Sequence, residues 1–126
     1  MRVLVDTDIY VDFLRNFKES KKVFEDIKNE KIIGFFSVIT EAELFSGKEC
    51  EYPEKRRSVE ELLSLTNRIK LDHSIAKKAG EIRRIYEIPL MDAMIAASAI
   101  VLDMTLYSKN VKHFEKIKEL KLKVPY

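Results

Sequence analysis

Short apolar runs alternate with segments of helical periodicity along nearly the whole chain. The runs that we interpret as strands are Val3 to Asp6, Ile32 to Ser37, Arg68 to Leu71, Thr105 to Ser108 and Leu122 to Val124. Helices are expected from Asp8 to Asn16, after Ser20, from Thr40, from Pro53, after Asp72 or Ser74, from Ala93 to Leu102 and after Asn110. Such alternation favours a three-layer α/β/α fold, with helices on both faces of a central, mostly parallel sheet of Rossmann-like topology.

Size and composition suit one globular domain covering residues 1–126, because two separate cores would be hard to bury in a chain of this length. The 23 basic and 21 acidic residues neither require nor exclude a nucleic-acid partner. Cys50 is the only cysteine, which fits a reducing compartment. Asp6 and Asp8 interrupt any signal peptide, and the apolar run from Ala93 to Leu102 is shorter than the ~20 residues of a membrane span. We therefore expect a cytoplasmic protein without a membrane segment.

Acidic residues adjoin the apolar runs, where an unpaired carboxylate is costly to bury. They are Asp6, Asp8, Glu43 and Asp92. In a parallel sheet the carboxyl ends of the strands share one edge, and ligands bind outside that edge. Asp6 ends the first strand, Glu43 follows the second, and Asp92 opens the helix that leads into a later strand. Like charges held together require a proton or a cation, so the pattern predicts a site for a hard divalent cation.

Each acid also has a purely structural interpretation. Asp6 or Asp8 could cap the first helix, and Asp92 could cap the buried helix. Glu43 could complete a capping box that begins at Thr40. Capping explains one acid per helix, but it does not explain why acids recur at the same edge of the sheet.

Four segments, in their order along the chain, together resemble the PIN-domain family, and specifically its VapC toxins. The segments that carry the resemblance run from Val3 to Leu14, from Ser37 to Gly47, from Leu90 to Ala99 and from Leu106 to Phe114. They cover nearly the whole chain in the family's order. The chain departs from the family pattern at Asn110, where many relatives carry Asp, at His113, where an acid is frequent, and at Asp8, where Asn or Ser is usual.

The resemblance implies a ribonuclease that uses Mg²⁺ or Mn²⁺ to cut RNA. The implied metal ligands are Asp6, Asp92, Glu43 and Asp8, and the implied catalytic residues are Asp6, Glu43, Asp92 and Asn110. Ser108, Thr7 and Lys109 would orient water or phosphate. The resemblance also implies a cognate VapB-type antitoxin as partner, and a homodimer.

Three alternatives remain open from the residues. The run Asp6-Thr7-Asp8 fits a haloacid-dehalogenase-type phosphatase with Asp6 as nucleophile, although the later acidic pair of those enzymes is missing. A receiver domain would need a phosphoacceptor Asp between Ile32 and Leu71, and the chain has none there. Asn110 keeps open a third alternative, a PIN scaffold that binds without catalysing.

Overall fold

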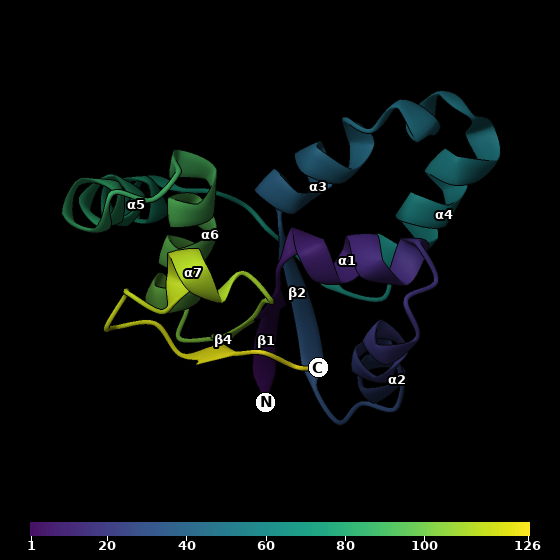
Figure 1. The fold of residues 1–126 in the computed structure, drawn as a ribbon, viewed down its shortest axis with the longest axis horizontal. Helices are drawn as coiled ribbons and strands as arrows, with labels where there is room; N and C mark the ends of the chain where they lie inside the picture. The colour runs from purple at the N-terminus through teal and green to yellow at the C-terminus, as the bar shows by residue number, and fades with distance from the viewer.

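Five parallel strands form one sheet through the centre of the computed structural model, which describes residues 1–126 (Figure 1). The strands are β1 (Arg2–Val5), β2 (Ile33–Ser37), β3 (Asn67–Ile69), β4 (Thr105–Tyr107) and β5 (Leu122–Lys123). They are ordered β3-β2-β1-β4-β5, and each neighbouring pair is parallel. The predicted parallel sheet is therefore confirmed.

Helices cover both faces of the sheet, as predicted. The α-helices are α1 (Thr7–Leu14), α2 (Lys21–Lys28), α3 (Val38–Phe45), α4 (Pro53–Leu63), α5 (His73–Tyr86), α6 (Leu90–Val101) and α7 (Val111–Phe114). Two short 3₁₀ helices are η1 (Lys18–Ser20) and η2 (Lys48–Glu51). Helices α5, α6 and α7 lie on one side of the strands, and α1, α2 and α4 lie on the other (Figure 1). None of these helices has both the length and the apolar character needed to cross a bilayer.

Two apolar cores lie on opposite faces of the sheet because successive strand residues point to opposite sides. Leu4 and Leu106 belong to the core under α5 and α6, whereas Val3, Val5 and Tyr107 belong to the core under α1, α2 and α4. Four alanines of α6 are fully buried and allow this helix to approach the sheet closely: Ala93, Ala96, Ala97 and Ala99. The apolar run that sequence analysis predicted as a buried helix therefore has that role.

The start of α3 differs from the prediction. The helix begins at Val38 rather than at Thr40, and its cap is Ser37, whose Oγ accepts a hydrogen bond from the N–H of Ile39 at 3.0 Å. The predicted capping box from Thr40 to Glu43 is therefore wrong, since both residues lie inside the helix. Glu43 is consequently free of any capping role.

The structure also shows where three other helices begin and whether the expected residues cap them. Helix α6 begins at Leu90, so Asp92 lies in its first turn and is not its cap. Ser20 precedes α2 without capping it, because its hydroxyl donates to the carbonyl of Phe17 at 2.6 Å. Asp72 is the cap of α5. Asp92 is thus left available for contacts outside its own helix.

The strand order creates a crevice at the carboxyl end of the central strand. From β1 the chain passes through α1 and α2 to β2 on one side, and it later returns to β4 on the other side of β1. The segments that leave β1 and β4 diverge, and ligands of open α/β sheets bind at such a point. Asp6 follows β1 directly and Ser108 follows β4 directly, so both lie at this crevice.

Candidate active site

Asp6 is the deepest acid at the crevice and is only 5% exposed. Its Oδ1 accepts a hydrogen bond from the N–H of Thr7 at 2.8 Å, and its Oδ2 accepts one from the hydroxyl of Ser108 at 2.7 Å. Asp6 is the cap of α1, so the capping interpretation holds for this residue together with its place in the crevice. Burial, and after it the charge of Asp8, raises the pKa of Asp6 to about 7. A nearby cation would therefore stabilise its charged form.

Asp8 lies two residues after Asp6, in the first turn of α1, and one of its carboxylate oxygens has no hydrogen-bond partner. Its Oδ2 accepts a hydrogen bond from the backbone N–H of Lys109 at 2.9 Å. Its Oδ1 is buried without a hydrogen-bond partner. Burial raises the pKa of Asp8, and the bond from Lys109 partly offsets that effect. A buried carboxylate oxygen without a partner is unusual in a folded protein, and it is available to a cation or to water.

Ser108 connects the turn after β4 to Asp6. Its hydroxyl donates to Asp6 and accepts a hydrogen bond from the N–H of Asn110 at 2.9 Å. The side chain is completely buried. The structure therefore places Ser108 behind Asp6, where its hydroxyl orients that carboxylate, and its expected role in orienting water or phosphate stays a prediction.

A chain of hydroxyl groups holds Glu43 at the crevice. Thr7 donates from Oγ1 to Oε1 of Glu43 at 2.8 Å, and the same Oγ1 is 2.9 Å from Oγ1 of Thr40. Thr7 has a single hydroxyl hydrogen, so Thr40 is the donor in the second contact. Thr40 and Glu43 come from α3 and Thr7 comes from α1. These contacts bring together two segments that are far apart in the sequence.

Asp92 reaches the crevice from α6 and pairs with His113 of α7. Its Oδ2 is 2.6 Å from Nδ1 of His113, and the side-chain amide of Asn110 is 3.0 Å from the same nitrogen. The atom of Asn110 at this distance is its amide nitrogen Nδ2, so its amide oxygen Oδ1 makes no contact with the ring nitrogen. From the sequence, His113 was only a departure from the family pattern, and the structure adds it to the site.

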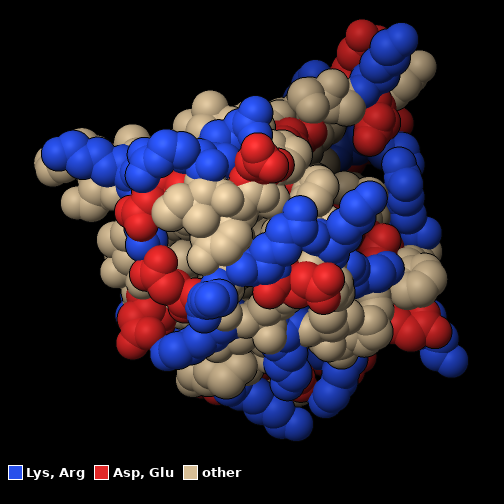
Figure 2. All heavy atoms as spheres, turned by 60° about the vertical axis from the view of Figure 1, so that its left-hand side comes forward, with Lys and Arg blue, Asp and Glu red and all other residues tan.

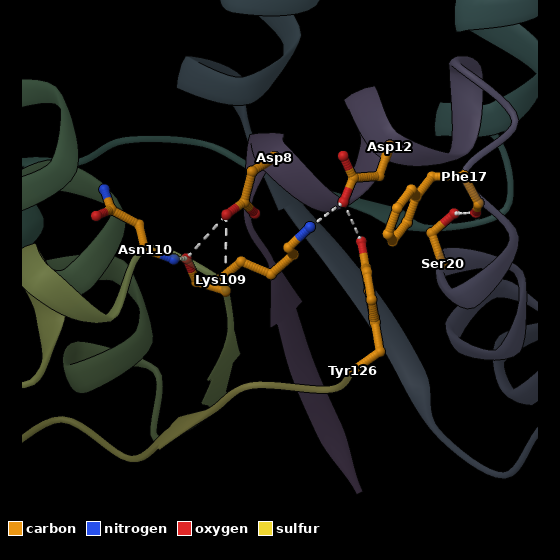
Figure 3. A network of polar contacts seen from close by, with 8 residues as sticks. Asp8, Asp12, Phe17, Ser20, Lys109, Asn110 and Tyr126 are labelled. Carbon is orange, nitrogen blue, oxygen red and sulfur yellow. Dashed lines mark hydrogen bonds and ion pairs between the residues drawn. The ribbon is translucent and has the colours of Figure 1, made fainter.

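Lys109 does not direct its ammonium group into the crevice (Figure 3). Nζ is 2.7 Å from Oδ2 of Asp12, and the hydroxyl of Tyr126 donates to the same oxygen at 2.7 Å. Nζ also lies 4.7 Å from the ring centre of Phe17 and 5.0 Å from that of Tyr126. The contribution of Lys109 to the crevice in this structure is its backbone N–H, which holds Asp8.

These segments enclose an open cavity of about 440 Å³. Its lining consists of five acids, one base and three other residues: Asp6, Asp8, Asp12, Glu43, Asp92, Arg15, Thr7, Val11 and Asn110. Asp12 and Arg15 were missed by sequence analysis, although their spacing from Asp8 on α1 is that of residues sharing one face of a helix. A cavity of about 480 Å³ between α3 and α4 lacks such a cluster, and its Arg68 is already paired with Glu41.

The acidic cavity suits a cation that keeps part of its water shell. No three acidic, cysteine or histidine side chains are grouped closely enough to coordinate one ion by themselves. Mg²⁺ commonly binds through one or two carboxylates together with several waters. Oδ1 of Asp8 has no hydrogen-bond partner, and burial raises the pKa of Asp6, so a cation in the cavity would stabilise the charged forms of both acids. The donor set therefore fits such an ion, with Asp6, Asp8 and Asp92 as its candidate ligands.

Comparison with known sequences gives a consistent set of relatives. The family model described as the PIN domain matches residues 3–120. The protein Ribonuclease VapC10 of Mycobacterium tuberculosis is 32% identical over 124 residues, which cover 94% of this chain and 90% of the relative. Ribonuclease VapC1 of Methanocaldococcus jannaschii is 30% identical over 129 residues, which cover 98% of this chain and 86% of the relative.

Solved structures resemble the chain over almost its full length. A toxin–antitoxin complex from Klebsiella pneumoniae contains a chain with a TM-score of 0.80 and 28% identity, and the match covers 98% of both chains. VapBC2 from Rickettsia felis, bound to a DNA fragment from its promoter, gives a TM-score of 0.82 and 25% identity, again with 98% of both chains covered.

Proposed function

This chain belongs to the PIN-domain family, and within it to the VapC proteins, and we propose that it is a divalent-metal-dependent endoribonuclease that acts as the toxin of a type II toxin–antitoxin pair. The observation that carries the proposal is the convergence of carboxylates from β1, α1, α3 and α6 on one cavity. The family assignment also removes the basis for a haloacid-dehalogenase-type phosphatase, which depended on Asp6-Thr7-Asp8 alone.

The side chains of the cavity have separate tasks in this proposal. Asp6, Asp8 and Asp92 would hold Mg²⁺ or Mn²⁺, directly or through water. A bound divalent cation would supply Lewis acidity at the scissile phosphate and acidify a neighbouring water. Glu43 is exposed, and only its Oε1 is engaged, by Thr7. Its Oε2 would accept the proton of the attacking water.

Asn110 and His113 support this arrangement from α7 and the turn before it. His113 holds Oδ2 of Asp92, which leaves Oδ1 for the cation. The amide oxygen of Asn110, which does not contact His113, would accept a hydrogen bond from a water molecule. Asn110 is thus proposed to orient water, although it brings no charge to the fourth acidic position of the family.

The proposed partners are an RNA substrate, a VapB-type antitoxin and a second copy of the chain. A cavity of about 290 Å³ adjoins the acidic one and has Val11, Leu14, Leu44 and Val59 in its lining, which suits an apolar segment of an antitoxin. The structures of the Klebsiella and Rickettsia relatives are complexes of toxin and antitoxin. Exposed apolar side chains on α5 and α6 would suit a homodimer: Ile85, Leu90, Met91 and Val101. The buried, unpaired Cys50 fits a cytoplasmic location.

Replacement of Asp92 by Asn tests the proposed activity. The substitution keeps the size of the side chain but removes its charge, so Asp92→Asn is expected to fold normally and to lose at least about a hundredfold in the rate of RNA cleavage with Mg²⁺. Cleavage of a labelled single-stranded RNA is measured with Mg²⁺, with Mn²⁺ and with a chelator. The matched control is Asp103→Asn, because Asp103 is exposed and pairs only with Lys121.

Wild-type activity is expected to disappear in the chelator and to return when Mg²⁺ or Mn²⁺ is added. A folded Asp92→Asn variant that cuts RNA at the wild-type rate would refute the assignment. A folded wild-type protein that binds RNA without cutting it would instead support the third alternative, a PIN scaffold without catalysis.

A further inference from the structure

The acidic cavity would repel a polyanionic substrate such as RNA. Its lining has five carboxylates, of which Asp12 is already paired with Lys109, and a divalent cation would neutralise only part of the remaining charge. An RNA strand that enters the cavity brings further negative charge with each phosphate. A basic side chain beside the metal-binding acids would therefore offset this repulsion and help the substrate to bind.

Lys109 is not available for this role, because its ammonium group is already engaged. It pairs with Asp12 at 2.7 Å and lies against the rings of Phe17 and Tyr126. The hydrogen bond from Tyr126 to Asp12 completes the group (Figure 3). Partial burial raises the pKa of Asp12, but the hydrogen bonds from Lys109 and Tyr126 outweigh burial, so the pKa lies below its usual value. Contact between Lys109 and a phosphate would require these interactions to break.

Arg15 is the one basic side chain that lines the acidic cavity. Its backbone forms the C-cap of α1, and its side chain is exposed and has no ion-pair partner. It also lines the adjoining cavity of about 290 Å³, as Glu43 does. The guanidinium group forms no ion pair, although its charge helps to lower the pKa of Asp12, and it lies at the boundary between the acids and the neighbouring groove.

We infer that Arg15 binds a backbone phosphate of the RNA substrate where the acidic cavity meets the adjoining one, and this inference depends on the proposed ribonuclease function. The guanidinium group is planar and can donate two parallel hydrogen bonds to one phosphate, which an ammonium group cannot do. Because Arg15 borders the cavity that contains Glu43 and Asp92, the phosphate it binds is the scissile one or its immediate neighbour. Arg15 thereby positions the strand on the metal-binding acids.

The test compares Arg15→Gln and Arg15→Lys with the control Arg57→Gln. Arg57 is also exposed and without an ion-pair partner, but it lies on α4 and lines neither cavity. Arg15→Gln is expected to lower kcat/KM for RNA cleavage roughly ten- to a hundredfold, mainly through KM. Arg15→Lys is expected to recover part of that loss, and Arg57→Gln is expected to match the wild type.

Binding is measured separately from cleavage, in an Asp92→Asn background, with a labelled single-stranded RNA at several salt concentrations. Loss of one phosphate contact is expected to reduce the slope of log Kd against log salt by about 0.7 in Arg15→Gln, whereas Arg15→Lys should keep the slope. An Arg15→Gln variant with the parental slope and a kcat/KM within twofold of wild type would overturn the inference. If the wild type binds RNA through Arg15 but does not cleave it, the proposed nuclease function would be contradicted. The inference that Arg15 binds an RNA phosphate would still stand.

Discussion

The carboxylate of Asp6 is buried, accepts two hydrogen bonds and lies near two other acids, Asp8 and Asp92. The pKa of Asp6 is raised from 3.8 to about 7 by burial first and by the charge of Asp8 second. At pH values between 3.8 and about 7, Asp6 is protonated in the folded protein and ionised in the unfolded chain. Stability falls with rising pH wherever the folded state binds more protons, so the charged form of Asp6 destabilises the metal-free protein.

This shift predicts how stability depends on pH without metal. In a chelator, the free energy of unfolding should fall as pH rises from about 4 to about 7, at up to about 1.4 kcal/mol per pH unit for this group. Asp6→Asn should remove that contribution and be more stable than wild type at pH 8 while lacking nuclease activity. Urea denaturation of both proteins across this pH range measures the effect. Identical pH dependence in the two proteins would show that Asp6 is not the titrating group.

Helix α3 carries Glu43 to the site, and its first residue is fixed by a cap that the sequence left ambiguous. Ser37 and Thr40 are both good capping residues, and only Thr40 is followed three residues later by Glu. The structure uses Ser37 because β2 runs directly into the helix, without an intervening loop. Local patterns therefore identified the helix but not its start, and the choice depended on the geometry of the strand before it.

Removal of this cap should destabilise the protein measurably. Ser37→Ala leaves the N–H of Ile39 without its partner in a buried position, so we expect a loss of about 1 to 2 kcal/mol in the free energy of unfolding. Ser58→Ala in α4 is the control, because its exposed hydroxyl only bonds the carbonyl of Glu54 in the same helix, and it should change stability by less than about 0.5 kcal/mol. Chemical denaturation of the two variants checks this, and equal effects would argue against the Ser37 cap.

For the molecule as a whole, the alternation of strands and helices was sufficient to predict a parallel sheet with two covered faces. It also placed Asp6, Glu43 and Asp92 at one edge, because the carboxyl ends of parallel strands meet there. The contacts of Lys109 could not be predicted in the same way. Lys109 pairs with Asp12, which lies 97 residues earlier in the chain, and Tyr126 donates a hydrogen bond to Asp12 from 114 residues away. Local periodicity in the sequence does not predict contacts at such separations.

Binding of Mn²⁺ followed by NMR would test most directly whether the separate acidic segments form one metal site. Mn²⁺ is paramagnetic and broadens the amide signals that lie near it. Titration into wild-type protein should broaden first the signals around Asp6 to Asp8, Asp92 and Lys109 to Asn110, and Asp92→Asn should require more Mn²⁺ for the same effect. Broadening that is absent, or that is centred on acids away from this cavity, would contradict a metal site at the carboxyl end of β1.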